Sequence, residues 1–166
     1  GLLLIANVTQ AGDAPKAAAS QETRATMHSI YATLSTAFRL SLNEADFGNP
    51  KKRKEINKAL KALSESAAAL RDHELQLGAD DDYLRRSLAD DAREALITYE
   101  RGHYEESRFI LYGMTENCIS CHSKRPDETD FDLAKNFSKD LRKAGVLLED
   151  RARIEAATRQ FDTALD

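Results

Sequence analysis

Apolar residues recur every three or four positions in four successive stretches of this 166-residue chain. That spacing puts them on one face of an α-helix, and each stretch is long enough to form one. The chain has only seven Gly and three Pro, and helix-favouring Ala and Leu are abundant whereas Val and Ile are few. We therefore predict an all-α fold, and the length favours one main domain.

The four predicted helices are separated by short turns. They cover about residues 20–41, 49–77, 80–101 and 104–122, with Ser20 as the N-cap of the first and Pro50 in the first turn of the second. Gly78, Gly102 and Pro126 end the last three helices. Because short loops make successive helices antiparallel neighbours, we predict an antiparallel four-helix bundle over residues 20–126.

Residues 127–166 predict one or two additional C-terminal helices. Leu133, Phe137 and Leu141 mark a short helix that ends near Gly145, and Leu147, Ile154, Phe161 and Leu165 mark another. The heptad spacing from Leu147 to Phe161 favours packing against a partner helix, and thus a homodimer. The helical pattern runs to the last residue, so we expect the chain to be part of a longer protein with a further region after it.

Residues 1–19 form an unusual start. The segment 1–6 is apolar but too short to span a bilayer, and small polar residues follow it. This order is typical of the end of an export signal, which would give the full-length protein an N-terminal membrane anchor before cleavage. An apolar arm that packs on the bundle, or on a second copy, is the alternative. We expect residues 1–19 to be a flexible lead or the remnant of an export signal.

Both cysteines of the chain lie in the segment Cys118-Ile119-Ser120-Cys121-His122. C-x-x-C-H is the attachment signature of a c-type haem. In a helical turn, the two thiols can reach the two vinyl groups of one porphyrin, and the next residue can direct its imidazole at the iron. We therefore predict one covalent haem c per chain, with Cys118 and Cys121 as thioether anchors and His122 as the proximal metal ligand.

Two other sites share part of this pattern. A thioredoxin-like dithiol needs a βαβ context, which this helical chain lacks, and a zinc site needs further ligands at a regular spacing. The remaining histidines are scattered singly: His28, His73 and His103. Covalent haem is therefore the favoured interpretation over zinc or a free dithiol.

With C-x-x-C-H late in the fourth predicted helix and Met27 early in the first, residues 20–125 resemble the cytochrome c′ family and its low-spin c556-type relatives. The resemblance implies that the residue opposite the iron comes from the first helix. A Met there implies a six-coordinate, low-spin iron, whereas an apolar residue implies a five-coordinate iron that takes NO or CO. The chain departs from the family in its long C-terminal segment, and in Arg125, which follows His122 by three residues rather than the common four.

The sixth ligand of the iron has three candidates. Met27 lies on the apolar face of the first helix, where its thioether would raise the iron potential if it binds, or would fill the core if it does not. His28 lies about 100° further round the helix and would give a lower potential. The third alternative is an open position. Met114, one turn before Cys118, is expected to pack against the porphyrin edge as part of the cofactor-binding set.

Charged side chains and one glycine complete the candidates. Haem propionates need cationic partners, and Arg108, Lys124 and Arg125 lie near the motif. Residues 51–54 form a basic run that would suit docking of an acidic redox partner protein, or would be a solvated helix end. Gly113 lies in mid-helix, where it costs stability relative to Ala, and close approach of the macrocycle or of a helix would explain it.

These patterns lead to one expected function and two alternatives. The expected protein is an exported, periplasmic bacterial c-type cytochrome that transfers single electrons. We do not expect the protein to be an enzyme, because the sequence shows no acid–base pair or nucleophile constellation. We expect no nucleic-acid binding, because the net charge is −4. The alternatives are gas (NO or CO) binding or sensing at a five-coordinate iron, and a haem-bearing interaction module of a larger helical protein.

Overall fold

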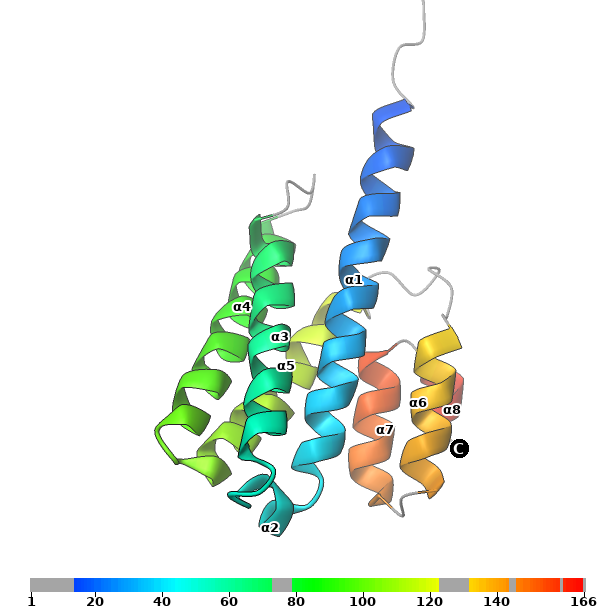
Figure 1. The fold of residues 1–166 in the computed structure, drawn as a ribbon. Coiled ribbons are helices and arrows are strands. Elements are labelled where there is room, and N and C mark those ends of the chain that lie inside the picture. Colours follow the sequence, from blue (N-terminus) through cyan, green and yellow to red (C-terminus); the bar gives the residue numbers. More distant parts are fainter. Residues whose placement is uncertain (1–13, 73–78, 123–131, 144–145, 159, 166) are drawn as a thin grey trace, which may run out of the picture.

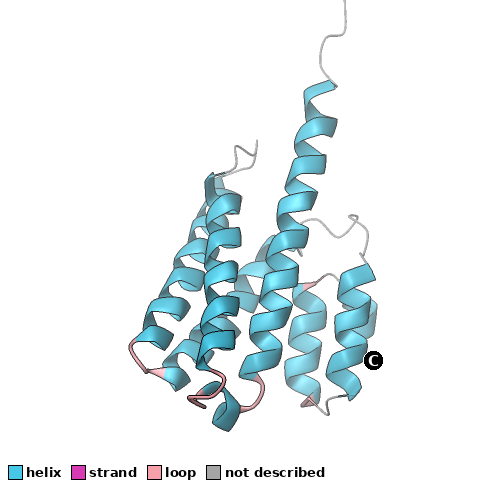
Figure 2. Ribbon diagram, viewed as in Figure 1, coloured by secondary structure: helices cyan, strands magenta, loops and turns pink. Residues whose placement is uncertain are grey.

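The computed structural model describes residues 14–72, 79–122, 132–143, 146–158 and 160–165, and these contain eight α-helices and no strand (Figure 2). The prediction of an all-α fold is confirmed. The helices are α1 (Ala14–Ser41), α2 (Glu44–Phe47), α3 (Arg53–Asp72), α4 (Ala79–Glu100), α5 (Tyr104–His122), α6 (Asp132–Lys143), α7 (Leu148–Ala157) and α8 (Phe161–Leu165). No described helix combines the length and the hydropathy that a bilayer crossing requires.

The first helix starts earlier than the sequence predicts. α1 begins at Ala14 rather than after Ser20, so residues 14–19 are helical and do not belong to a flexible lead. Pro15 is tolerated in a first helical turn, and the alanines that follow it are the strongest helix formers. Residues 1–13, which include the proposed remnant of an export signal, lie outside the described residues.

The apolar faces of the first three long helices are buried as predicted. On α3 the buried residues are Ile56, Ala59, Leu60, Leu63, Ala67 and Leu70. Its start differs from the prediction, because Asn49 and Pro50 form a turn in which the Asn49 side-chain oxygen accepts from the Lys51 N–H at 3.0 Å. The helix itself begins at Arg53. The short α2, which the sequence pattern does not reveal, is capped by Asn43.

A glycine turn joins α4 to α5. Gly102 has φ +86°, a left-handed conformation that glycine adopts at little cost. Its N–H donates to the carbonyl of Tyr99 at 3.0 Å, and the next N–H, of His103, donates to the carbonyl of Thr98 at 3.1 Å. This pair of bonds closes the helix end in a Schellman motif. The predicted boundary at Gly102 is confirmed, and the turn sends α5 back along α4.

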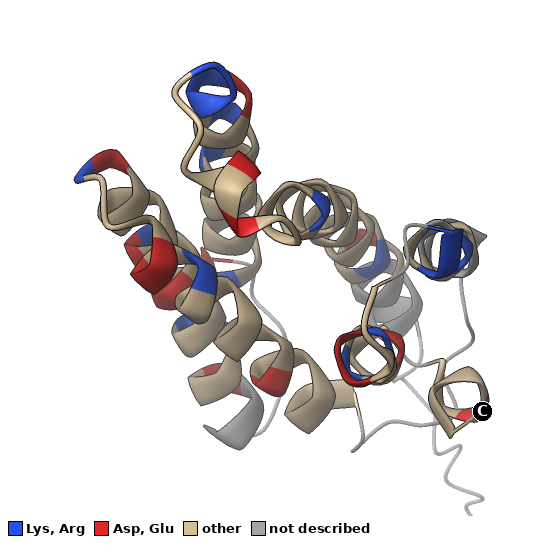
Figure 3. Ribbon diagram, turned by 90° about the horizontal axis from the view of Figure 1, so that it is seen from below, with Lys and Arg blue, Asp and Glu red and all other residues tan. Residues whose placement is uncertain are grey.

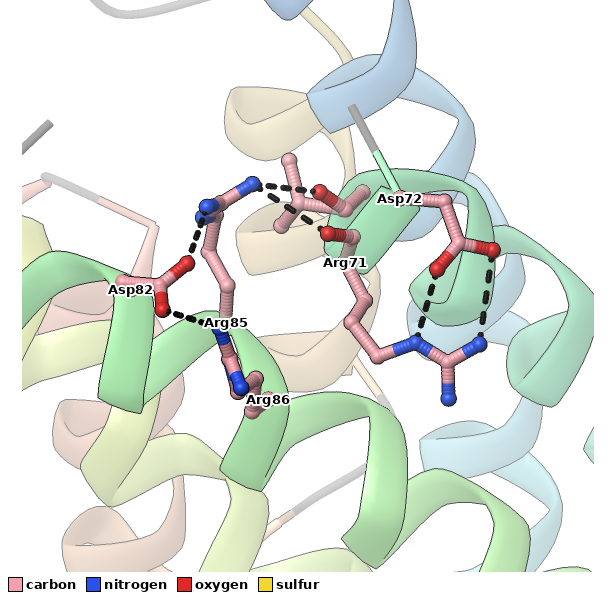
Figure 4. A network of polar contacts seen from close by, with 6 residues as sticks. Arg71, Asp72, Asp82, Arg85 and Arg86 are labelled. Carbon is pink, nitrogen blue, oxygen red and sulfur yellow. Dashed lines mark hydrogen bonds and ion pairs between the residues drawn. The ribbon is translucent and has the colours of Figure 1, made fainter. Parts of the chain in front are cut away.

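At the opposite end, a buried arginine joins α4 to α3. The guanidinium of Arg85 donates to the last-turn carbonyls of Leu70 at 3.1 Å and Arg71 at 3.4 Å, and it pairs with Asp82 (Figure 4). Carbonyls at a helix C-terminus have no partner within the helix, and a cation there also meets the negative end of the helix dipole. Arg85 thus fixes the end of α3 against the beginning of α4.

The long helices pack in a defined order. α1 packs on α3, α3 on α4 and α4 on α5, with successive helices running in opposite directions (Figure 1). α7 packs on α5 and on α6, and α6 touches α1, whereas α1 and α5 meet at few points. Leu141 of α6 and Ile154 of α7 belong to the same apolar core as Leu34, Leu60 and Leu111. Leu141 and Ile154 therefore anchor α6 and α7 in the common core.

The last predicted helix is divided in two. α7 ends at Ala157, and the chain leaves the helical pattern where the Gln160 N–H donates to the Glu155 carbonyl, five residues back, at 2.8 Å. Ile154 is buried within this chain, whereas Leu147 is 73% exposed. The prediction of one continuous heptad face is therefore wrong, and with it the reason to expect a homodimer through that face.

Candidate functional site

The C-x-x-C-H segment forms the last turns of α5. Cys118 and Cys121 lie three residues apart in a helix and so face the same side, and they are not joined in a disulfide. Both cysteines and His122 are half-buried, and Cys118 packs against the apolar core. The three predicted attachment residues therefore lie on the last turns of α5, where Cys118 adjoins the core.

The environment of Cys118 changes its acidity. Burial raises the pKa of this thiol to about 12, and the neighbouring Cys121 contributes in the same direction. Burial has this effect because it disfavours the charged thiolate. At neutral pH the Cys118 sulfur is therefore a protonated thiol.

The imidazole of His122 has a defined hydrogen bond. Its Nδ1 lies 2.7 Å from the carbonyl oxygen of Ala157, at the C-terminal end of α7. A carbonyl oxygen can only accept, so Nδ1 must donate and carries the proton. In a neutral ring the available lone pair then resides on Nε2. This tautomer can bind a metal through Nε2.

Contacts on both sides fix this turn of α5. The Asn117 amide donates to Asp91 at 2.8 Å and to Ser87 at 3.2 Å, which joins the turn to α4. On the other side Glu116 pairs with Arg153 of α7 at 3.0 Å. Burial raises the pKa of Asp91, and the hydrogen bond from Asn117 opposes that shift. The segment next to the cysteines is therefore positioned by two helices.

The two rival distal ligands differ in environment. Met27 of α1 is half-buried and packs against the same core as Cys118, whereas His28 is exposed. Tyr31, one turn after Met27, is buried, and that burial raises its pKa above the ordinary value. Met114 is fully buried within the core. A thioether on α1 thus meets the apolar interior that a porphyrin needs, and the imidazole of His28 does not.

Within the described residues, none of the three cationic side chains proposed as partners of the haem propionates is seen near the cysteines. Arg108 donates to the Ser41 carbonyl at 2.9 Å and pairs with Glu44 at 2.9 Å. It therefore joins the first half of α5 to the end of α1 and is not available to a propionate near Cys118. Lys124 and Arg125 lie outside the described residues.

The basic run at the start of α3 is only partly available for docking. Lys52 pairs with Asp46 at 2.8 Å, and Arg53 bonds to the Tyr104 hydroxyl. At this end of the molecule, where α2 lies and α3 starts, ribbon segments of basic and acidic residues lie close together (Figure 3). The charges of this end therefore compensate one another more than a long basic run implies.

A zinc site gains no support from the described residues. Among them, no three His, Cys, Asp or Glu side chains gather as a metal-binding group. A structural zinc ion takes four such ligands. The attachment of a porphyrin needs only the two thiols and one imidazole, which is the set that α5 presents.

We expect Gly113→Ala to stabilise the protein by roughly 0.5–1 kcal/mol, because Ala is the better helix former. Gly113 is exposed, and a Cβ atom there would meet nothing within 4 Å. The measurement is the free energy of unfolding in urea. A loss of stability instead would mean that the macrocycle or another surface approaches this face of α5 closely.

Two parts of the site have no signal in the sequence. The carbonyl of Ala157 comes from a helix far along the chain. The residue type alanine does not predict which donor its backbone carbonyl accepts from. The bond from Asn117 to Asp91 likewise depends on the packing of α4 on α5. Comparison of the chain with known protein families, with curated proteins and with solved structures gives no match. The case for a function therefore rests on the residues of the site.

Proposed function

We propose that this protein is a c-type monohaem cytochrome that transfers single electrons. The observation that carries the proposal is the C-x-x-C-H segment on the last turns of α5, with Cys118 against the apolar core and the proton of His122 on Nδ1. A haem supplies reversible one-electron exchange between Fe(III) and Fe(II). In this chain Cys118 and Cys121 would hold it by thioether bonds, and His122 would bind the iron through Nε2.

The arrangement of the helices supports a place for the porphyrin. We propose that α1, α3, α4 and α5 act as an antiparallel four-helix bundle of the cytochrome c′ kind. Three of its four sides are closed by direct helix packing, and the side between α1 and α5 has few contacts. Met27 of α1 and Cys118 of α5 both adjoin the core.

Met27 is the proposed sixth ligand. Its half-buried position against the core supports ligation, whereas the exposed position of His28 does not. A thioether ligand raises the potential and closes the iron to small gases, which favours electron transfer over NO or CO binding. The rest of the proposal follows from the haem: a redox partner protein, and export to the periplasm, where such cytochromes are matured.

The test is the mass and the spectrum of protein made in a bacterial host that matures c-type cytochromes. We expect an intact mass increased by one protohaem that persists in denaturing solvent, and a reduced spectrum with sharp α and β bands. The matched control is the double variant Cys118→Ser/Cys121→Ser, which should keep no haem in denaturing solvent. A wild-type chain with no added mass, made beside a cytochrome that the same cells mature, would overturn the proposal.

A further inference from the structure

The carbonyl that accepts the hydrogen bond from His122 lies at the C-terminal end of α7. Ala157 is the last residue of that ten-residue helix, so its carbonyl is one of those that no N–H of the helix can reach. The C-terminal end of a helix also carries the negative end of the helix dipole. The Nδ1–H group of His122 thus points at an acceptor that is more negative than an isolated carbonyl, at 2.7 Å.

The position of that carbonyl is determined by a buried turn. The Thr158 N–H donates to the carbonyls of Ile154 at 3.1 Å and Glu155 at 3.2 Å, and the Thr158 hydroxyl repeats both contacts. The Gln160 amide donates to the Thr158 hydroxyl at 2.9 Å. Thr158 and Gln160 are both buried. The peptide unit that follows Ala157 therefore has little freedom to rotate.

α7 itself is held in place on two sides. The buried carboxylate of Glu155 accepts from Ser138 of α6 and lies 3.5 Å from Arg142 of the same helix. Arg153 pairs with Glu116 of α5 at 3.0 Å. Movement of α7 along α5 would break these contacts, so the distance between His122 and Ala157 is set by the packing of the C-terminal helices.

We propose that the carbonyl of Ala157 orients the proximal histidine and sets its donor strength, so that α7 is part of the haem site. This inference rests on the proposed function, because it concerns the iron ligand named there. A hydrogen bond from Nδ1 makes Nε2 a stronger base and stabilises the ferric form. The carbonyl of Ala157 therefore lowers the reduction potential below the value that the same ligands would give without it.

The first experiment moves the carbonyl and measures the potential. Thr158→Pro removes the Thr158 N–H and hydroxyl bonds, and a residue before proline is driven out of the helical conformation, so the Ala157 carbonyl turns away. We expect the ferrous form to gain at least about tenfold relative to the ferric form, a rise of about 59 mV for one electron. Leu148→Pro is the control, because Leu148 is exposed and is the first residue of the same helix, where proline is tolerated.

The second experiment uses the wild-type protein. It tests the hydrogen bond from His122 to Ala157 even if Thr158→Pro does not fold. In ferrous wild-type protein labelled with ¹⁵N-histidine, the Nδ1–H proton of His122 should exchange with solvent at least ten times more slowly than that of an exposed histidine. Fast exchange, or equal potentials for the two proline variants, would overturn the inference while the haem remains attached. A chain that takes up no haem would instead overturn the proposed function, and this inference with it.

Discussion

In the proposed cytochrome, Met27→Leu should convert the iron from six-coordinate low spin to five-coordinate high spin. Leucine keeps the volume and apolar character of the side chain but has no sulfur to bind the metal. The ferric absorption spectrum should lose the weak band near ~695 nm that accompanies Met ligation. The ferrous form, closed to carbon monoxide in the wild type, should bind it stoichiometrically. Because Met27 is only half-buried, we expect little loss of stability from the change.

The chain offers a matched control in its only other methionine. Met114 is fully buried in the core, and Met114→Leu should leave both the spin state and the response to carbon monoxide unchanged. A Met27→Leu protein with the wild-type spectrum would exclude Met27 as a ligand. In that case the loss of the low-spin spectrum in His28→Ala would identify the neighbouring imidazole, against the exposure of that side chain.

Glu155→Ala should lower the free energy of unfolding by roughly 1–3 kcal/mol, because the buried Ser138 hydroxyl loses its acceptor and the half-buried Arg151 loses its ion-pair partner. The Glu155 carboxylate is fully buried, accepts from Ser138, and lies 3.5 Å from Arg142 and 3.7 Å from Arg151. Its second oxygen has no hydrogen-bond partner in the part of the chain that the structure describes. Urea unfolding of the haem-loaded protein, followed by circular dichroism, measures the change.

Glu149→Ala is the control for this prediction. Glu149 lies in the first turn of the same helix and is exposed, so the same substitution there should change stability by at most about 0.5 kcal/mol. Equal stability of the two variants would show that the buried carboxylate contributes nothing to the attachment of α7 on α6.

The reduction potential of the Glu155→Ala protein should also rise, because a shifted α7 moves the carbonyl of Ala157 away from His122.

The helices of the first two thirds of the chain could be predicted because their signals are local. The spacing of Ile56, Leu60 and Leu63 marks the buried face of α3 without reference to any other helix. Gly102 ends α4 through its own backbone conformation. The C-x-x-C-H segment is local as well, since the last turns of α5 carry both thiols and the imidazole. Periodicity and a short motif therefore predict these parts directly.

Sequence reasoning missed one local feature and several contacts between distant segments. The heptad spacing from Leu147 onward predicts a continuous face, but α7 ends at Ala157, and the Gln160 N–H donates to the Glu155 carbonyl five residues back. The bond between His122 and Ala157, and the contact of Glu155 with Ser138, arise only when α7 packs on α5 and α6. Such pairings have no fixed sequence spacing, so no pattern along the chain predicts them.

The protonated state of Cys118 has a consequence for the biogenesis of the protein. In an oxidising compartment, two thiols three residues apart are prone to close on each other, and that reaction starts from a thiolate. With its pKa raised to about 12, the Cys118 sulfur supplies almost none at neutral pH. A chain that folds before its cofactor arrives would thus be slow to close a disulfide by attack of the Cys118 sulfur.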